Sequence, residues 1–180
     1  AKKLGDTKFL AQTYNSLFYV YYNSLDFDQA LDLLSQAIEL SIKSNDKKNL
    51  IRLYNNKGLV LYAEKKYSEA LDCMRKAMSL TAAGEKIERA QVYTNMAEVY
   101  YSQAKYAETE SLLAKAIAEL DGKRISTKTL QTYLNMALVK ARLGKKTETK
   151  EIQHRINGIS PMLPLPLKVN SLRQMADIDF

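Results

Sequence analysis

The chain has 180 residues, of which 46% are hydrophobic, and its net charge is +7. This hydrophobic fraction supports a packed core and argues against global disorder, while no apolar run approaches the roughly 18 residues of a membrane-spanning helix. Cys73 is the single cysteine, which excludes an internal disulfide, and no cluster of His and Cys has the spacing of a metal site. We therefore expect a folded protein that uses no metal or other cofactor.

The positive charge is concentrated toward the C-terminus. Residues 1–120 hold 16 Lys and Arg against 15 Asp and Glu, whereas residues 121–180 hold 11 against 5. Such a basic run is usually a solvated helix face, although it can also mark an acidic partner or nucleic acid. Nucleic-acid binding is disfavoured because only Tyr133 and Phe180 are available there to stack on bases. The excess gathers around Lys140, Arg142, Lys145, Lys146, Lys150 and Arg155.

An internal repeat runs through the chain and indicates its architecture. Four similar segments begin at Tyr14, Tyr54, Tyr93 and Tyr133, which are 40, 39 and 40 residues apart, and a weaker copy begins at Leu172. This spacing predicts one array over residues 1–180. Its units span about 8–47, 48–85, 86–124 and 125–165, with a partial unit at 166–180.

Each unit is expected to contain two helices. In the second unit, Ala70, Leu71, Met74, Ala77 and Met78 recur at the spacing of one helical face, and no useful alternation indicates a strand. The expected helix pairs span about 8–24 and 28–44, 48–64 and 68–81, 86–103 and 107–120, and 125–143 and 147–157, with a last helix from about 168. Three glycines lie just past expected second helices, where a helix C-terminus favours them: Gly84, Gly122 and Gly158.

The repeat resembles the tetratricopeptide repeat (TPR) family, whose pattern places aromatic and small residues at fixed positions of two helices. The first three units match best, and Thr109 in the third replaces an expected alanine. The matching residues are Tyr14, Leu17, Tyr21, Ala30, Leu34 and Ala37 in unit one, Tyr54, Gly58, Ala70, Met74 and Ala77 in unit two, Tyr93, Ala97, Tyr100, Leu113 and Ala116 in unit three, and Tyr133 and Ala137 in unit four.

The length of the repeat departs from the usual TPR period of 34 residues. Units of 39–40 residues are similar to those of kinesin light chains and of bacterial TPR regulators that sense peptides. The small residues Gly58, Ala97 and Ala137, one turn after each tyrosine, favour the TPR family over HEAT-type arrays of similar period. The resemblance implies an all-α fold, a right-handed superhelical solenoid of antiparallel helix pairs, and a binding function without catalysis.

Both ends of the chain indicate a piece of a longer protein. Residues 1–6 are typical of the tail of a preceding second helix, and the last helix stops at Phe180 before a partner helix appears. Neither end has the polar cap that a solenoid normally needs. The lone cysteine is compatible with a reducing compartment, and we expect a cytoplasmic location.

A polar arc remains on the first helix of each unit after the apolar positions are placed on a helical wheel. The resemblance implies that this arc is the concave face, where the family binds peptides or partner helices. Amides there offer both a donor and an acceptor to a peptide backbone. The predicted groove residues are Gln12, Asn15, Tyr22, Arg52, Asn55, Asn56, Tyr62, Gln91, Asn95, Tyr101, Gln131, Asn135 and Arg142.

The row of asparagines in this arc has a second interpretation. Asn56, Asn95 and Asn135 occupy one register, and asparagine is a poorer helix former than alanine by several tenths of a kcal/mol. Partner binding along one continuous surface would explain the row, but so would amides that bond between adjacent helices. The sequence leaves both interpretations open.

Three other features have plain interpretations. His154 has no catalytic partner at useful spacing, so we expect a surface histidine. Cys73 lies beside Met74 on a helix and is expected to pack. The Pro161-Met162-Leu163-Pro164 segment has a PxxP form, but its position between two helices favours a packed connection.

The sequence therefore predicts a protein–protein interaction scaffold that takes an extended peptide or a helix. A peptide-sensing segment of a bacterial transcription regulator or sensor kinase is the second hypothesis. Nucleic-acid binding through the basic end is the third. An enzyme is the least favoured, because no constellation of catalytic residues is present.

Overall fold

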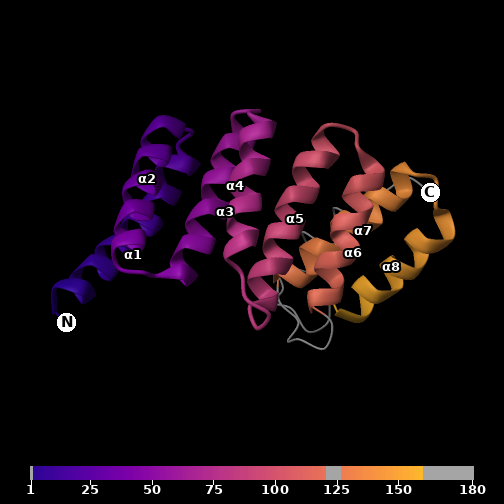
Figure 1. Cartoon of the computed structure of the whole chain (residues 1–180). Helices are drawn as coiled ribbons and strands as arrows, with labels where there is room; N and C mark the ends of the chain where they lie inside the picture. Colours follow the sequence, from indigo (N-terminus) through magenta and orange to yellow (C-terminus); the bar gives the residue numbers. More distant parts are fainter. Residues whose placement is uncertain (1, 121–126, 160–180) are drawn as a thin grey trace. The chain divides into compact units, whose positions relative to one another are not determined.

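The computed structural model describes residues 2–120 and 127–159, and this part of the chain consists of eight α-helices without a strand (Figure 1). The all-α prediction is confirmed, and the helix bounds agree with the predicted ones within about two residues except at the start. The helices are α1 (Lys2–Asn23), α2 (Phe27–Lys43), α3 (Lys47–Ala63), α4 (Tyr67–Leu80), α5 (Lys86–Ser102), α6 (Tyr106–Leu120), α7 (Thr127–Arg142) and α8 (Lys146–Ile159).

The start of α1 corrects one prediction. Residues 2–6 do not end a preceding helix but continue into α1 without a turn, because an isolated glycine such as Gly5 is tolerated inside a helix and no proline follows it. The helix predicted from about residue 168, the Pro161–Pro164 segment and Gly122 lie outside the described residues.

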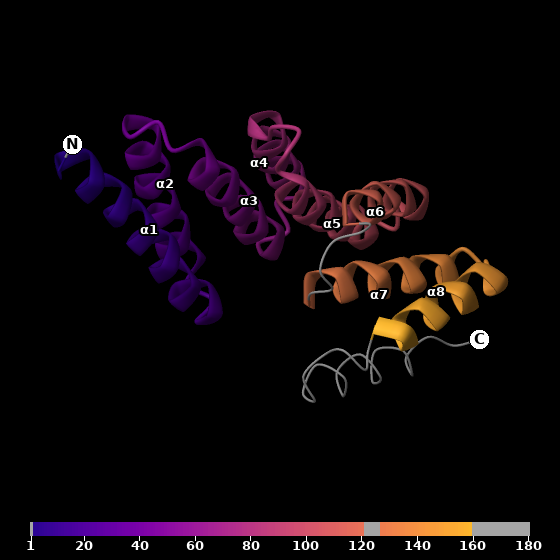
Figure 2. The ribbon, with the colours of Figure 1, turned by 90° about the horizontal axis from the view of Figure 1, so that it is seen from below.

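Contacts between Cα atoms divide the chain into two compact units, residues 1–88 and 89–180. In the first unit α1 packs on α2, α3 packs on α4, and α2 also contacts α3, as Figures 1 and 2 show. In the second unit α6 contacts α7, and α7 packs on α8. Short turns between successive helices make each pair antiparallel. The prediction of a single array over residues 1–180 remains a prediction.

The tight turns share one backbone geometry. Each contains a residue in the left-handed region, and in each the next amide donates to a carbonyl five residues back, as Lys66 N does to Leu61 O at 2.9 Å. This is the Schellman arrangement that satisfies the last carbonyls of a helix. The left-handed residues and their φ angles are Leu25 (62°), Asn45 (51°), Lys65 (62°), Ala104 (57°) and Gly144 (70°).

The glycine predictions are only partly correct. Gly84 does follow the end of α4, but its φ is not in the left-handed region, and Gly158 lies inside α8 rather than past it. Within residues 2–120 and 127–159, the one glycine in a left-handed turn is Gly144, which was not among the three predicted to follow helices. Asp26 and Asp46 follow two of the turns and cap the next helix, accepting bonds from Gln29 N and Asn49 N at 3.2 and 3.1 Å.

The small residues one turn after each leading tyrosine lie at the contact between paired helices. A Cβ on Gly58 would stand 2.9 Å from Met74 Cγ and 3.0 Å from the Ala70 carbonyl oxygen, both on α4. The equivalent Ala97 and Ala137 are buried. Residue 18 in the first repeat is a buried phenylalanine instead, so this repeat fills the same position with a large side chain.

Valines at the same position of each repeat show that the first helices are also buried on a side other than the one that faces the paired helix. Val60, Val99 and Val139 are each 0% exposed, whereas the equivalent Val20 on α1 is 60% exposed. Helix α3 lies against both α2 and α4, and Val139 of α7 belongs to a cluster with Leu113 of α6. In the first unit, no described helix precedes α1 to cover the equivalent face.

Replacing these valines should therefore have unequal effects. We expect Val60→Ala to lower the free energy of unfolding by about 1.5–3 kcal/mol, since it removes two buried carbons and leaves a cavity. Val20→Ala removes the same atoms from a largely exposed position and should cost less than about 0.5 kcal/mol. Urea denaturation followed by circular dichroism measures both, and equal losses would contradict the assignment of α1 as an uncovered helix.

Candidate functional site

The first helices of successive repeats meet along a polar seam, which is described here for the second unit. Three contacts run in order along α5 and α7. Thr94 Oγ1 and Thr132 Oγ1 share a hydrogen bond of 3.0 Å, Asn135 Nδ2 donates to Glu98 Oε1 at 3.1 Å, and Arg142 Nε donates to Tyr101 Oη at 3.3 Å. We call the surface along this seam the α5–α7 face, made of Gln91, Asn95, Glu98, Tyr101, Gln131, Asn135 and Arg142.

A pair of amides recurs on this face at the distance of one repeat. Gln91 Nε2 donates to Asn95 Oδ1, and Gln131 Nε2 donates to Asn135 Oδ1, each at 2.8 Å. In both pairs the glutamine lies one turn before the asparagine, so its bond fixes the asparagine oxygen within the helix. On α7 this orients the Asn135 amino group toward α5, where it meets Glu98.

The first unit has the equivalent seam between α1 and α3. Asn56 Nδ2 donates to Asn15 Oδ1 at 2.9 Å, and Asn55 and Asn56 are both buried. Arg52, one turn before Asn56 on α3, is exposed, and its Nη2 lies 3.8 Å from Glu88 Oε1. Gln12, on α1, is exposed to solvent.

The predicted row of tyrosines is part of the turns between paired helices. Tyr22, Tyr62 and Tyr101 each lie near the aromatic residue that opens the next helix, with ring centroids 6.0, 6.1 and 5.4 Å apart. The opening residues are Phe27, Tyr67 and Tyr106. The tyrosines are half-buried, so they stabilise the turn on one side and face solvent on the other.

The structure thus places two residues of the asparagine row, Asn56 and Asn135, in the seams between helices. Asn56 and Asn95 are buried, Asn135 is half-buried, and Asn56 and Asn135 each bond across to the neighbouring first helix. This is the bonding between helices that the sequence left open as an alternative. A direct contact of these asparagines with a peptide stays a prediction.

Glu98 is the residue of this face that the predicted groove omits. It is half-buried, and burial raises the pKa of its carboxyl, an effect that the hydrogen bond from Asn135 partly offsets. Among the described residues no Lys or Arg forms an ion pair with it. The sequence did hold a signal, because Glu98 is the only charged residue in a register otherwise filled by Tyr19, Leu59 and Leu138.

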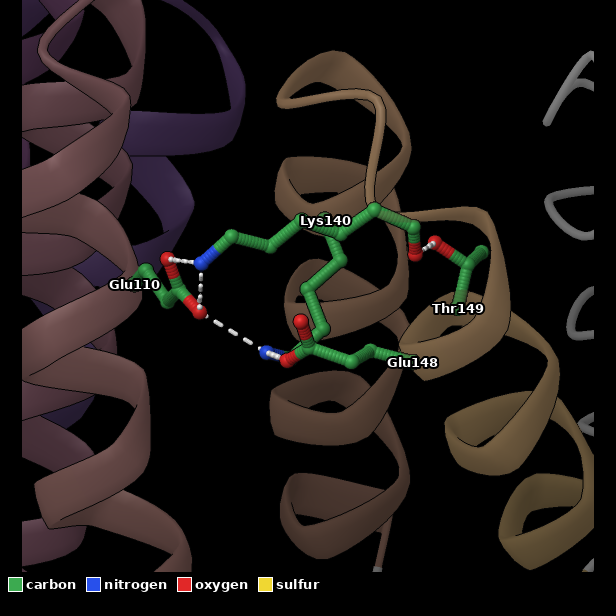
Figure 3. Close-up of polar contacts among 5 residues, drawn as sticks. Glu110, Lys140, Glu148 and Thr149 are labelled. Atoms are coloured by element: carbon green, nitrogen blue, oxygen red, sulfur yellow. Dashed lines mark hydrogen bonds and ion pairs between the residues drawn. The ribbon is translucent and has the colours of Figure 1, made fainter.

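The basic end of the chain is partly neutralised within the fold (Figure 3). Glu110 on α6 accepts from Lys140 Nζ at 2.7 Å and from Lys145 Nζ at 2.8 Å, and Lys140 also bonds Glu148. Thr149 Oγ1 donates to the Lys145 carbonyl at 2.9 Å. Lys140 is buried at the junction of α6, α7 and α8. By contrast, Lys146, Lys150 and Arg155 are exposed, as expected for a solvated helix face.

These ion pairs shift the pKa values of their members in opposite directions. Hydrogen bonds from Lys140 and Lys145 lower the pKa of Glu110 below its ordinary value. Burial by itself would lower the pKa of Lys140, but the bonds to Glu110 and Glu148 outweigh it and the pKa is raised. Both groups therefore stay charged at neutral pH, and the network stabilises the packing of the last described helix pair.

His154 and Cys73 lie where the sequence predicted, one at the surface and the other packed on a helix. His154 is exposed on α8, and Cys73 is half-buried on α4, where burial raises the pKa of its thiol. Over residues 2–120 and 127–159, no group of three His, Cys, Asp or Glu side chains is arranged to hold a metal ion. None of the helices in the same ranges is both long enough and apolar enough to cross a bilayer.

Comparisons with known proteins agree with this architecture. The tetratricopeptide repeat pattern matches residues 9–83 and again residues 89–118, together more than half of the chain. No curated protein matches the sequence. The agreement with solved structures confirms the predicted fold class, the all-α helical repeat fold of TPR superhelices.

Three solved structures illustrate the likeness. BtubC (BKLC) from P. vanneervenii has a TM-score of 0.74 at 18% identity, over 87% of this chain and 65% of that one. A protein from Podosopora anserina, assigned as a kinesin light chain with nearly identical TPR-like repeats, has a TM-score of 0.74 at 17% identity, over 96% and 86%. NprR in complex with its cognate peptide NprX has a TM-score of 0.71 at 21% identity, over 89% and 46%. The chain thus spans less than two thirds of two of these structures.

The ion-pair network around Glu110 should make the stability of the protein depend on pH. Because the folded-state pKa of Glu110 lies below its unfolded value, its stabilisation is present above the ordinary glutamate pKa and is lost as the pH falls through the lowered one. At pH 7, Glu110→Gln should cost about 1.5–3 kcal/mol, and this difference from the unmodified protein should shrink on acidification below about pH 4.

The matched control for this change is Glu151→Gln, which removes an exposed carboxylate of α8. It should cost less than about 0.5 kcal/mol at either pH. Urea denaturation at pH 7 and at pH 3 measures both variants. A penalty for Glu110→Gln that does not change with pH would show that the negative charge of Glu110 does not provide the stabilisation.

Proposed function

Because the chain belongs to the tetratricopeptide repeat family, we propose that it is a non-catalytic scaffold that binds a peptide or protein segment. The observation that carries this proposal is the α5–α7 face, where two equivalent Gln–Asn pairs stand on neighbouring first helices. A repeated amide pattern on adjacent helices suits a ligand that itself repeats, and an extended peptide backbone is such a ligand.

The accessible parts of this face match that ligand. Tyr101, Gln131 and Asn135 are half-buried and Arg142 is exposed, so polar atoms remain at the surface although each side chain is held by its neighbours. Side chains fixed by hydrogen bonds lose little further entropy when a ligand arrives, which favours binding. Helices pack about 8–10 Å apart, a distance that about three residues of an extended peptide would span.

The comparison structures support peptides as the ligand class. NprR shares the fold at a TM-score of 0.71 and was solved with its cognate peptide NprX. This likeness favours, as a second candidate, a peptide-sensing segment of a bacterial transcription regulator or sensor kinase. The two candidates share the binding event and differ in what the rest of the parent protein does with it.

Nucleic-acid binding through the basic end receives less support from the structure. Lys140 and Lys145 are held by Glu110, and Arg142 donates to Tyr101. Fewer Lys and Arg side chains are therefore free to bind phosphates than the number of basic residues in 121–180 suggests. The salt-dependent affinity for nucleic acid should be correspondingly weaker.

A peptide array with a double variant tests the proposal. Random peptides of eight to ten residues are screened for binding, and the best are measured by fluorescence anisotropy. Replacing both Gln131 and Asn135 with Ala should weaken binding by about 1–3 kcal/mol, since each amide–backbone bond contributes about 0.5–1.5 kcal/mol. The free energy of unfolding should also fall, by about 1–3 kcal/mol, because Glu98 loses its hydrogen bond from Asn135, and the better helix propensity of alanine offsets this only in part.

The control is Gln36→Ala, which removes a comparable amide from a second helix. Gln36 is exposed on α2 and donates to Asp32 Oδ2 at 2.7 Å, so it also makes a bond within its own helix. Its loss should leave peptide affinity unchanged. If the double variant melts several degrees lower while affinity is unaffected, the amides are purely structural and the α5–α7 face is not the binding surface.

A further inference from the structure

Glu98 differs from the other partly buried carboxylates of the second unit. Glu110 lies 2.7 Å from Lys140 Nζ, and Glu119 lies 2.8 Å from Arg89 Nε. Glu98 instead accepts one hydrogen bond, 3.1 Å long, from the neutral amide of Asn135. Within the described residues its negative charge has no cation at ion-pair distance, although the side chain is half-buried.

A negatively charged carboxylate that is partly buried without a cation lowers the stability of the protein when no ligand is bound. Burial removes part of its hydration, and a neutral amide restores only part of what is lost. The raised pKa of Glu98 expresses the same imbalance. A cation that arrives with a ligand would satisfy the remaining lone pairs of the carboxylate, and such charge-assisted bonds are roughly twice as strong as neutral ones.

The surroundings of Glu98 suit the stem of a long basic side chain. Tyr101 lies one turn further along α5 and packs against Tyr106 at 5.4 Å, which presents aromatic surface next to the carboxylate. Aliphatic stems of Lys and Arg cover such surface while their charged ends reach a polar group. Arg142 lies seven residues beyond Asn135 on α7, about 10 Å away along the helix. Its charge disfavours a ligand cation at that end of the face.

We propose that Glu98 is a specificity-determining residue of the α5–α7 face and that it binds a cationic group of the peptide ligand. The cation is a Lys or Arg side chain or the terminal ammonium, which share the same chemistry. This inference rests on the proposed peptide-binding function and narrows it to peptides that present a positive charge beside Glu98. Asn135 positions the carboxylate, and Tyr101 provides the apolar wall.

The experiment screens one random octapeptide library, in free and N-acetylated forms, against the unmodified protein and three variants. Glu98→Gln keeps an acceptor for Asn135 and removes the charge, Glu98→Lys reverses the charge, and Glu151→Gln removes an exposed carboxylate from α8 as the matched control. The unmodified protein and Glu151→Gln should enrich peptides with a basic group. Glu98→Gln should bind those peptides about tenfold or more weakly, and Glu98→Lys should favour acidic peptides.

The two peptide forms identify the source of the cation. Binding that survives N-acetylation assigns the site to a Lys or Arg side chain, and binding that is lost assigns it to the terminal ammonium. Thermal unfolding of Glu98→Gln should show no loss of stability, because the change removes a partly buried charge without an internal cation partner. This readout separates a recognition role from a structural one.

Two results would overturn the inference, and they can be told apart. If peptides bind without preference for a basic group, or bind Glu98→Gln as well as the unmodified protein, the face recognises peptides but Glu98 does not select them. If no peptide binds any of the four proteins, the proposed peptide-binding function fails together with the role of Glu98.

Discussion

A first helix in this repeat is buried on two sides, and most of its polar side chains must satisfy their hydrogen bonds within narrow seams. Leaving a buried donor or acceptor unpaired costs about 1–3 kcal/mol, so each seam contains matched polar groups. Thr94 meets Thr132 between α5 and α7, and Asn56 meets Asn15 between α3 and α1. The other sides of the first helices are filled by apolar contacts, as Gly58 meets α4 and Val139 packs in a cluster with Leu113 of α6. Both the apolar packing and the pairing of polar groups therefore follow from the burial of the first helices on two sides.

The same requirement explains why charge is distributed unevenly over the second unit. Where α6, α7 and α8 converge, a buried lysine is balanced by two carboxylates, and Glu110 in turn holds a second lysine. Along the α5–α7 seam, the single carboxylate receives only a neutral amide. In the first arrangement, the positive and negative charges balance within the protein. In the second, the negative charge of Glu98 has no positive partner among the described residues. In our proposal, this difference distinguishes the structural role of Glu110 from the recognition role of Glu98.

The fold could be predicted from the sequence because its signals recur. Four copies of one pattern with leading tyrosines 39–40 residues apart located the helix pairs closely, since a repeated error would have had to occur four times. The predictions failed where a single residue decided the outcome. Gly158 was expected to end a helix, yet glycine is tolerated near a helix end, and nothing in the sequence distinguishes the two cases. The start of α1 was also predicted wrongly, because Gly5 is likewise tolerated inside the helix.

The candidate site was harder to predict than the fold. A helical wheel places the amides on one arc, but it describes one helix and not the neighbour against which that helix lies. Whether Asn95 faces solvent or a seam depends on packing between helices, and the structure buries it. Glu98 was left out of the predicted groove because it breaks the pattern of its register instead of repeating it. A search for repeats finds what units share, whereas specificity is expected at the positions where they differ.

The left-handed turns have a consequence for how the stability of this protein can be engineered. Four of the five occupy that conformation with Leu25, Asn45, Lys65 or Ala104, although a side chain there costs about 1–2 kcal/mol per residue, less for asparagine. Glycine would relieve the strain, offset in part by the greater entropy that it contributes to the unfolded chain. Since these turns recur between successive helices, the strain accumulates with the number of turns. The turns thus form a set of independent sites at which thermal stability can be tuned stepwise without altering a helix face.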